Sequence, residues 1–263
     1  MNVLIVVPTY NERENLPALI HAVVGDSGFN MIVVDDDSPD GTGDVAEACA
    51  AAYPGRVRVL HRTEKRGLGR SYVDGFRQAV LSDADLICQM DADLSHDPQY
   101  LPEMVAAAEQ FDVVVGSRYV NGISVVNWPL RRIILSSFAN GYVRAITGLK
   151  ASDCTSGFRC WRRDALARID LDRMISNGYA FQVEMLFEAA RRGYRIGEVP
   201  ITFIERENGA SKLGSRVLWE SAFVPWRLRL ARRGGRAGKT HLDSPSHVVA
   251  GAVSGDGPQN AAQ

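Results

Sequence analysis

The sequence has few cysteines and no long apolar run. Its four cysteines, Cys49, Cys88, Cys154 and Cys160, include no Cys-x-x-Cys pair of the kind found in zinc and redox sites. We therefore expect reduced core thiols, as in a cytosolic protein, and no zinc. No window reaches the ~18 apolar residues that a membrane-spanning helix needs. The first residues also lack the basic flank and cleavage site of a signal peptide.

The sequence also lacks internal repeats and runs of one residue type, which argues against solenoid, collagenous and disordered chains. Its 263 residues are 46% hydrophobic and 23% charged, as in ordinary globular proteins. The net charge is only -1, but it is unevenly distributed: residues 1–190 sum to -7 and residues 191–239 to +8. This basic block favours an anionic partner, either a membrane surface or a phosphorylated ligand.

The first 117 residues alternate short apolar runs with helical stretches. Strands are predicted over 3–7, 31–34, 57–60, 86–90 and 113–116. Helices are predicted between them over 12–24, 42–52, 68–81 and 98–110. Because the runs are apolar throughout, the strands should be covered on both faces, which indicates a parallel sheet in an α/β fold. Ligands of such sheets bind at the carboxyl ends of the strands.

The remaining residues follow a different pattern. Apolar side chains at helical spacing predict an amphipathic helix over 130–146. Further strands are predicted over 152–161 and 196–204, with helices over 181–191 and 213–230; Pro225 should end or kink the last helix. We expect one domain over residues 1–233 and a disordered, glycine-rich tail over 234–263.

Two aspartates directly follow the apolar run 86–90. In extended backbone, residues i and i+2 point the same way about 6.6 Å apart, so Asp91 and Asp93 can present two carboxylates on one face. Such a pair suits Mg²⁺ or Mn²⁺, which bind one or two carboxylates together with phosphate oxygens. The alternative is a pair of solvated turn aspartates, because so short a motif often occurs by chance.

A second acidic cluster follows the second predicted strand. Asp35, Asp36 and Asp37 are consecutive, and their mutual repulsion is best explained by a ligand with donor groups, such as a base edge or ribose hydroxyls. Tyr10 and Glu12 follow the first strand and could meet a nucleoside at the same edge of the sheet.

Together these motifs resemble glycosyltransferase family 2, the inverting enzymes of the GT-A fold, and within it the polyprenol (dolichol) phosphate mannose synthases. The resemblance runs from Val3 to about Arg229 and rests on segments 6–12, 34–36, 38–42, 91–96, 116–119, 156–159 and 205–213. It implies an α/β, Rossmann-like fold with a mostly parallel sheet flanked by helices, and C-terminal amphipathic helices.

The resemblance also implies roles for individual residues. The guanosine of GDP-mannose would be held by Pro8, Tyr10, Glu12, Val34 and Asp36. Sugar, diphosphate and metal would be held by Asp91, Ala92 and Asp93, with Ser95 as a further metal ligand. Phosphate contacts would come from Arg118, Arg206 and Lys212, and the acceptor phosphate would also meet Arg132 and Ser136. Asp91, Asp93 and Arg118 would be the catalytic residues.

The implied reaction transfers mannose from GDP-mannose to a polyprenyl phosphate, with Mg²⁺ or Mn²⁺, at the cytoplasmic face of a membrane. Three alternatives are a sibling enzyme that uses UDP-glucose or another nucleotide sugar, a phosphatase with an Asp-x-Asp nucleophile, and a non-enzymatic nucleotide-sugar or lipid-phosphate binding subunit that recruits a membrane partner. A separate membrane-anchoring protein is a further candidate partner, and nucleic acid is not an expected one.

Because the implied acceptor is a lipid, we expect peripheral attachment to the membrane. Six basic residues lie within 13 positions, at Arg227, Arg229, Arg232, Arg233, Arg236 and Lys239. Apolar residues precede them, at Trp219, Phe223, Val224 and Trp226. The helix over 130–146 is a second candidate for attachment. The alternative is that both apolar stripes pack on the core.

Overall fold

The computed structural model describes residues 1–63, 67–174, 176–205 and 223–230. Several sequence predictions fall outside these residues: Arg206, Lys212, Trp219, the part of the 213–230 helix before residue 223, the basic positions Arg232, Arg233, Arg236 and Lys239, and the tail 234–263.

Seven strands of the described chain form one sheet in the order β3-β2-β1-β4-β7-β5-β8. Their bounds are Val3–Thr9 (β1), Asn30–Asp35 (β2), Val57–His61 (β3), Leu86–Gln89 (β4), Val113–Ser117 (β5), Arg159–Arg162 (β7) and Ile196–Pro200 (β8). A parallel pair, β6 (Val125–Val126) and β9 (Phe203–Ile204), lies beside it. Among the described strands of this sheet, β7 alone runs antiparallel to its neighbours, β4 and β5.

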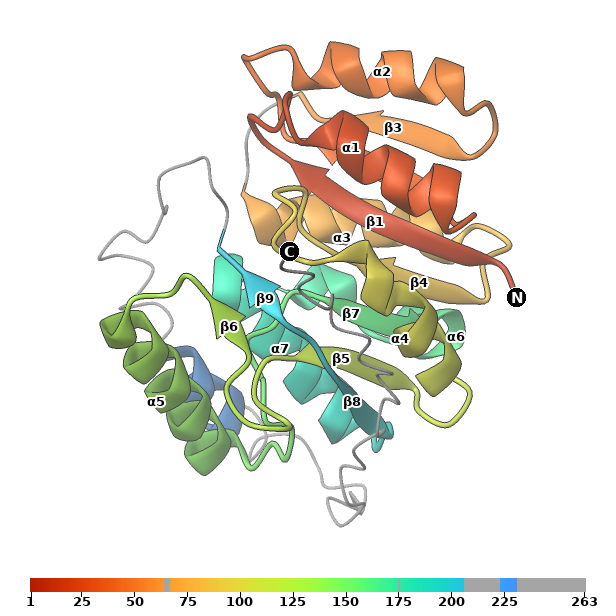
Figure 1. Cartoon of the computed structure of the whole chain (residues 1–263). Coiled ribbons are helices and arrows are strands. Elements are labelled where there is room, and N and C mark those ends of the chain that lie inside the picture. Colours follow the sequence, from red (N-terminus) through yellow and green to blue (C-terminus); the bar gives the residue numbers. More distant parts are fainter. Residues whose placement is uncertain (64–66, 175, 206–222, 231–263) are drawn as a thin grey trace, which may run out of the picture.

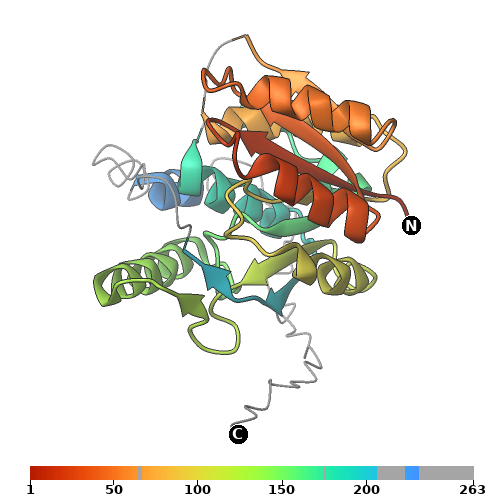
Figure 2. The same cartoon turned by 45° about the horizontal axis from the view of Figure 1, so that its top comes forward.

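Helices cover both faces of the sheet (Figures 1 and 2). Their bounds are Leu16–Ile20 (α1), Thr42–Ala52 (α2), Leu68–Val80 (α3), Leu101–Ala107 (α4), Leu130–Thr147 (α5), Arg163–Ala167 (α6) and Gly178–Arg191 (α7). In β1, Val3, Ile5 and Val7 join the core under α1, α2 and α4, whereas Leu4 and Val6 join the core under α3 and α7. This alternation explains why the strand is apolar at every position.

The predicted α/β fold with a mostly parallel sheet is confirmed, but two of the predicted helices are too long. Residues 12–24 form α1 only from Leu16 and continue as a π-helix over His21–Asp26. Asn11 adopts a left-handed backbone conformation (φ 60°), so a turn separates β1 from the helix. Residues 98–110 form a 3₁₀ turn, Pro98–Tyr100, before α4. Pro102 in the first turn of α4 explains the restart, because proline cannot donate to a preceding helical turn.

The predicted strand 152–161 was also too long, since only Arg159–Arg162 pair in the sheet. The backbone amides of Ser152 and Asp153 donate to the carboxylate of Glu198 at 2.8 and 3.1 Å, and the amide of Cys154 donates to Asn140 Oδ1 at 2.8 Å. Side chains therefore accept the hydrogen bonds of these backbone amides, which a neighbouring strand would otherwise accept. The predicted strand 196–204 is divided between β8 and β9, and β6 was not predicted.

The four cysteines are free thiols, as predicted, although Cys49 is only half-buried. Cys88 on β4 lies opposite Cys160 on β7, and both side chains are buried. Burial raises the pKa of the Cys88 thiol well above its usual range. Within the described residues, no helix has the length and apolar character required to cross a membrane.

The apolar side chains of helix α5 are divided between the core and the surface. Val143 and Ile146 reach the core, whereas Ile134 and Phe138 are 60% and 69% exposed. Residues 223–230 are helical and continue past Pro225, which therefore does not end the helix. Trp226 Nε1 donates to the Tyr142 hydroxyl at 3.0 Å, so this segment lies against α5. We call the exposed set the apolar surface: Leu130, Ile134, Leu135, Phe138, Phe223, Trp226 and Leu230.

Candidate active site

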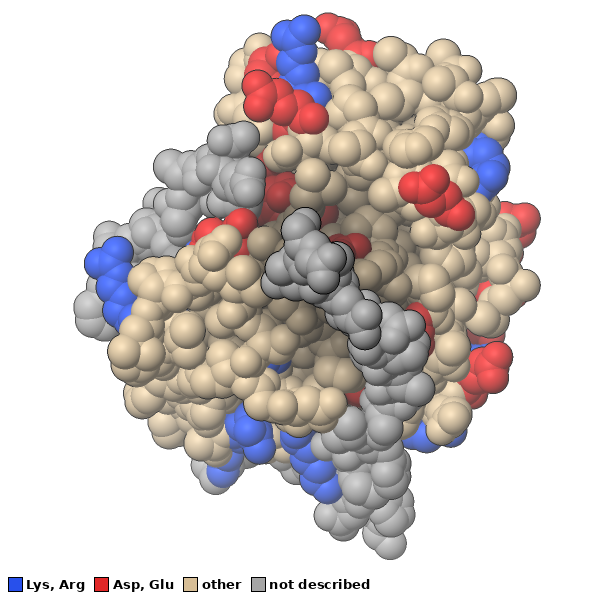
Figure 3. Space-filling model, viewed as in Figure 1, with Lys and Arg blue, Asp and Glu red and all other residues tan. Residues whose placement is uncertain are grey.

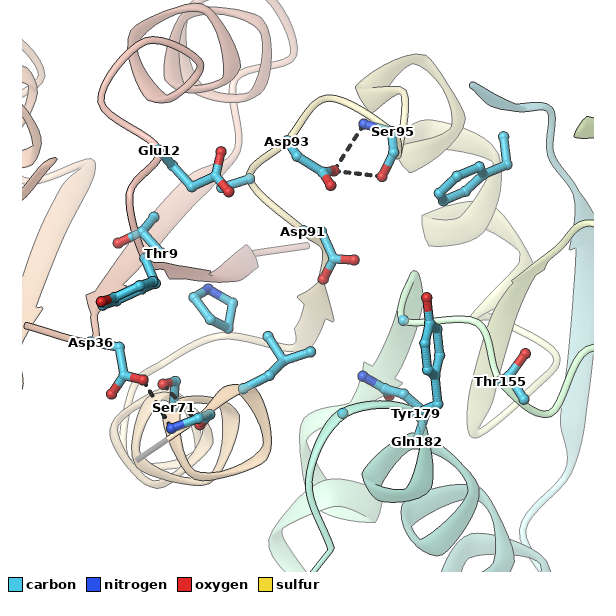
Figure 4. Close-up of a pocket in the computed structure, with 18 of the residues that line it drawn as sticks. Thr9, Glu12, Asp36, Ser71, Asp91, Asp93, Ser95, Thr155, Tyr179 and Gln182 are labelled. Atoms are coloured by element: carbon cyan, nitrogen blue, oxygen red, sulfur yellow. Dashed lines mark hydrogen bonds between the residues drawn. The ribbon is translucent and has the colours of Figure 1, made fainter. Parts of the chain in front are cut away.

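A pocket of about 520 Å³ opens at the carboxyl ends of β1, β2 and β4 (Figure 4). It is lined by Pro8, Thr9, Tyr10, Glu12, Asp36, Gly67, Leu68, Ser71, Asp91, Ala92, Asp93, Ser95, Arg132, Thr155, Gly157, Gly178, Tyr179, Gln182, Phe203 and Glu205. The pocket thus lies at the strand ends where the sequence predicts ligand binding, and later segments of the chain close its other side.

Three non-glycine residues beside the pocket have left-handed backbone conformations. Asn11, Asp37 and Leu94 follow β1, β2 and β4, with φ angles of 60°, 59° and 61°. Such conformations are unfavourable for side chains other than glycine and concentrate at functional sites. Each lets the chain turn sharply, which leaves the residues next to it facing the pocket.

The two aspartates after β4 are held by neighbouring side chains. Ser95 donates to Asp93 Oδ1 from its backbone amide at 3.2 Å and from its hydroxyl at 2.5 Å. Tyr72 on α3 donates to Asp91 Oδ1 at 3.2 Å. Ser95, predicted as a metal ligand, therefore contacts the neighbouring carboxylate in this structure.

The imidazole of His96 supports the same turn. Its Nδ1 accepts a 3.0 Å hydrogen bond from the backbone amide of Asp91, which places the ring proton of neutral His96 on Nε2. The ring stacks on Phe158 and is buried. Burial lowers the pKa of His96, although Asp91 and Asp93 act in the opposite direction.

The acidic cluster after β2 is divided between structural and pocket positions. Asp35 accepts from Thr9 Oγ1 and Ser38 Oγ, at 3.1 and 2.6 Å, and so fixes the turn. Asp36 lines the pocket, forms an ion pair with Arg62, and accepts from the Gly67 amide at 3.0 Å. Asp37 is exposed and does not line the pocket.

The opposite wall carries a cation. Arg132, in the first turn of α5, forms an ion pair with Glu205, and both line the pocket. The guanidinium of Arg132 lies 4.0 Å from the ring centroid of Trp128, a cation–π contact. The indole therefore holds Arg132 in one orientation at the pocket rim.

Arg118 lies behind this wall and not among the residues that line the pocket. Its Nε and Nη2 donate to Asp153 at 2.7 and 2.8 Å, and Nη2 also donates to Thr155 Oγ1. Burial raises the pKa of Asp153, but the attraction of Arg118 outweighs it and lowers the pKa overall. The pair is a buried, bidentate salt bridge.

The predicted site residues thus fall into three groups. Those brought together in the pocket are Pro8, Tyr10, Glu12, Asp36, Asp91, Ala92, Asp93, Ser95 and Arg132. Those placed elsewhere are Val34, which is fully buried in β2, Arg118, and Ser136, which accepts from the Tyr119 hydroxyl at 2.7 Å. Arg206 and Lys212 lie outside the described residues. The contacts predicted for all of them with substrate remain predictions.

Carboxylates dominate the pocket. Glu12, Asp36, Asp91, Asp93 and Glu205 line it with the single described cation Arg132. Acidic side chains lie recessed in the hollow in Figure 3. Within the described chain no three His, Cys, Asp or Glu side chains are grouped as a metal site. The two carboxylates of Asp91 and Asp93 would suit Mg²⁺, which binds one or two carboxylates together with phosphate oxygens and water.

Sequence patterns missed the residues from α7 and its neighbours. Tyr179 and Gln182 lie in a stretch of α7 whose apolar spacing is typical of a core helix, so they carry no local signal. Gly157 and Glu205 fall in segments that supported the family resemblance, without a role being assigned. These residues meet Asp91 and Asp93 only through the tertiary fold.

Comparison with known proteins places these features in a family. The sequence pattern of the family described as Glycosyl transferase family 2 matches residues 4–170. The chain is 47% identical over 236 residues to the undecaprenyl-phosphate mannosyltransferase of Micrococcus luteus, covering 89% of this chain and 96% of that protein. It is 44% identical over 233 residues to the polyprenol monophosphomannose synthase of Mycolicibacterium smegmatis, covering 86% and 87%.

Solved structures share the fold at low identity. The mannosyltransferase PcManGT of Pyrobaculum calidifontis, solved with GDP-Man and Mn²⁺, aligns with a TM-score of 0.53 and 19% identity over 90% of this chain and 76% of that one. TarS residues 1–349 of S. aureus, solved with UDP-GlcNAc, aligns with a TM-score of 0.54 and 17% identity over 92% and 70%. The predicted GT-A-type fold is confirmed, and the chain belongs to glycosyl transferase family 2 and is a glycosyltransferase.

Proposed function

We propose that this enzyme transfers mannose from GDP-mannose to the phosphate of a polyprenyl phosphate, with inversion at the anomeric carbon. The observation that carries the proposal is the arrangement of α5: Arg132 faces a pocket that also holds Asp91 and Asp93, while Ile134 and Phe138 of the same helix are exposed. A water-soluble donor and a lipid-borne phosphate could therefore meet at one place. The names of the two bacterial relatives, both polyprenol-phosphate mannosyltransferases, support this assignment.

The donor would occupy the part of the pocket built from the first hundred residues. Tyr10, Glu12 and Asp36 offer an aromatic ring and hydrogen-bond acceptors to the nucleoside. Asp91 and Asp93 would hold Mg²⁺ or Mn²⁺ together with the diphosphate, and the cation would neutralise negative charge on the departing GDP. The Pyrobaculum mannosyltransferase, solved with GDP-Man and Mn²⁺, has the same fold and supports this choice of donor and metal.

The acceptor would enter from the side of α5. A phosphate monoester carries about -1.5 to -2 charges at pH 7, so its oxygen is a competent nucleophile without a strong general base. A new bond forms between that oxygen and the anomeric carbon, the bond from that carbon to the donor diphosphate breaks, and GDP leaves with the electron pair. Arg132 would hold the acceptor phosphate in line, and Ser136 on the same helix is a second candidate contact.

The apolar surface supports attachment at a membrane. Tyr142 stacks on Phe138 and accepts from Trp226, so the exposed apolar side chains of α5 and of residues 223–230 lie close together. Arg131 and Arg144 of α5 are also exposed. Apolar side chains with flanking arginines are typical of helices that lie in the headgroup region. We place the enzyme on the cytoplasmic face, peripherally, with a separate membrane protein as a further candidate partner.

One experiment tests the reaction directly. The purified chain is incubated with sugar-labelled GDP-mannose, a polyprenyl phosphate and Mg²⁺ or Mn²⁺, and the lipid product is extracted into organic solvent. We expect label in the organic phase with GDP-mannose, none without the divalent cation, and retention of the label when unlabelled UDP-glucose is added. Label transferred from UDP-glucose but not from GDP-mannose would assign the enzyme to the sibling activity instead.

A further inference from the structure

A buried glutamine on α7 presents an unpaired donor to the pocket wall. Gln182 is only 2% exposed, lines the pocket, and lies across from Asp91 in Figure 4. Its side-chain oxygen accepts from Gln89 Nε2 at 2.9 Å. Its amide nitrogen Nε2 is buried and has no hydrogen-bond partner among the described residues. Buried donors in folded proteins are nearly always paired, so this exception calls for a ligand.

The orientation of this amide follows from its neighbours. Trp161 Nε1 donates to Gln89 Oε1 at 2.9 Å, and an indole nitrogen can only donate. Gln89 must therefore direct its oxygen at Trp161 and its amide nitrogen at Gln182. Gln182 in turn must direct its oxygen at Gln89, which leaves its two N–H groups on the pocket side. The core thus fixes the direction in which Gln182 can donate.

Gly157 leaves a small space in front of this donor. A Cβ at position 157 would stand 3.5 Å from Gln182 Nε2 and 3.6 Å from Asp91 Oδ1. The same point lies 3.5 Å from His96 Cε1. An amide donor and a carboxylate acceptor therefore border one small space, and the missing side chain of Gly157 keeps it open.

We infer that Gln182 is a specificity-determining residue that donates a hydrogen bond from Nε2 to a hydroxyl of the transferred sugar, over the space that Gly157 leaves beside Asp91. A hydroxyl can accept from the amide and donate to the carboxylate at once, whereas a phosphate oxygen can only accept. The juxtaposition of Gln182 and Asp91 therefore selects the sugar rather than the diphosphate. The inference rests on the proposed glycosyl transfer from a nucleotide sugar.

The test combines Gln182→Met with single-deoxy analogues of the donor sugar. Methionine keeps the length of the side chain and removes the donor. We expect kcat/KM for the nucleotide sugar to fall about tenfold, while the Kd for GDP, which lacks the sugar, stays unchanged. With the parent enzyme, one deoxy analogue should give a lower kcat/KM than the complete sugar donor. With Gln182→Met, the same analogue and the complete donor should give equal kcat/KM values, since both changes remove the same hydrogen bond.

Two further variants keep the test decisive. Gly157 does not have a positive φ, so Gly157→Ala can fill the space without backbone strain. This variant should also reduce kcat/KM for the sugar donor while GDP binding persists. It serves in place of Gln182→Met if that variant does not fold. Gln110→Met changes an exposed glutamine that does not line the pocket and should match the parent enzyme.

The outcomes separate the inference from the proposed function. Turnover of any nucleotide sugar by the parent enzyme is sufficient for the test, so a failure with GDP-mannose alone contradicts the proposed donor and not the role of Gln182. The inference would be overturned if Gln182→Met left kcat/KM unchanged, or if its loss added to the loss from every deoxy analogue. It would also be overturned if the affinity for GDP fell by the same factor as kcat/KM.

Discussion

The hydroxyl of Tyr72, in the middle of α3, donates a 3.2 Å hydrogen bond to Asp91 Oδ1 at the end of β4. The tyrosine ring is fully buried and stacks on Phe76 and Phe181, with centroids 5.6 and 6.0 Å away. Burial raises the pKa of the Tyr72 hydroxyl well above its usual range, and the Asp91 carboxylate raises it further. The hydroxyl therefore keeps its proton and holds one oxygen of Asp91 in a fixed position.

We expect Tyr72→Phe to weaken Mn²⁺ binding about tenfold, as losses of hydrogen bonds to a metal ligand commonly do. The ring, and hence the packing, would be retained. Activity is titrated against Mn²⁺ concentration, and Mn²⁺ binding is measured in the presence of GDP. The matched control is Tyr53→Phe, which removes a hydroxyl that is hydrogen-bonded to His21 and does not line the pocket. An unchanged Mn²⁺ affinity in Tyr72→Phe would show that the hydrogen bond does not position Asp91.

Substitution of Asp93 should abolish transfer. Asp93→Ala removes a proposed metal ligand, which leaves the charge of the diphosphate uncovered as the sugar leaves. Ser95→Ala removes only the hydroxyl that bonds Asp93, so its loss should be smaller, about tenfold. Product formation is measured at saturating Mg²⁺ and Mn²⁺. Asp97→Ala, which changes a capping aspartate outside the pocket, serves as control. Near-normal turnover by Asp93→Ala would contradict the metal assignment.

The buried pair Arg118–Asp153 should contribute to stability. Asp153→Asn leaves the guanidinium without its buried partner and should lower the free energy of unfolding by about 3–5 kcal/mol at pH 7. Asp164→Asn breaks an exposed pair with Arg163 and should change it by less than about 1 kcal/mol. Urea unfolding measures both. Equal losses in the free energy of unfolding would show that the buried pair stabilises the fold no more than the exposed pair does.

The same pair predicts a dependence on pH. The pKa of Asp153 is lower in the folded protein than its unfolded value of about 3.9. Its contribution is therefore complete above that value and is lost as the pH falls toward the lowered folded pKa. The difference in unfolding free energy between the parent enzyme and Asp153→Asn should shrink as the pH is lowered below about 4. A difference independent of pH would contradict the proposed origin of the stability.

The apolar surface should mediate binding to vesicles. Phe138→Glu places a charge where we propose contact with acyl chains and should weaken binding to anionic vesicles about tenfold or more. Leu81→Glu, at an 82% exposed leucine beyond the far end of α3, is the matched control. Sedimentation with vesicles measures binding, and transfer to a short, water-soluble polyprenyl phosphate should be unaffected. Equal binding by both variants would locate the attachment elsewhere.

The sequence was sufficient to predict most strands and the polar edge of the sheet. Buried parallel strands such as β1 and β2 have a clear apolar pattern, and Asp36, Asp91 and Asp93 follow strands directly. Where tertiary contacts replaced local structure, prediction failed: the amides of Ser152 and Asp153 bond Glu198 in place of a strand neighbour. Gln182 could not be found from its local sequence, because its role depends on Gln89 and Trp161, which are distant in the chain.

Arg118 shows a different limit. Its motif was recognised, but no local pattern indicated that Asp153 would accept from two of its guanidinium nitrogens. Likewise, the spacing of Ile134 and Phe138 indicated an amphipathic helix and left open whether it packs on the core or faces a membrane. Their exposure in the structure favours the second alternative.

The antiparallel strand β7 also has a consequence for synthesis on the ribosome. Gln89 on β4 pairs with Arg159, so one edge of β4 has no partner until about 70 more residues have been added. At 5–20 residues per second, this interval is roughly 4 to 14 s. During that time the apolar edge beside Cys88 is open to pairing with other chains. The nascent N-terminal half, with β1 to β4 already made, is therefore exposed to aggregation during this interval.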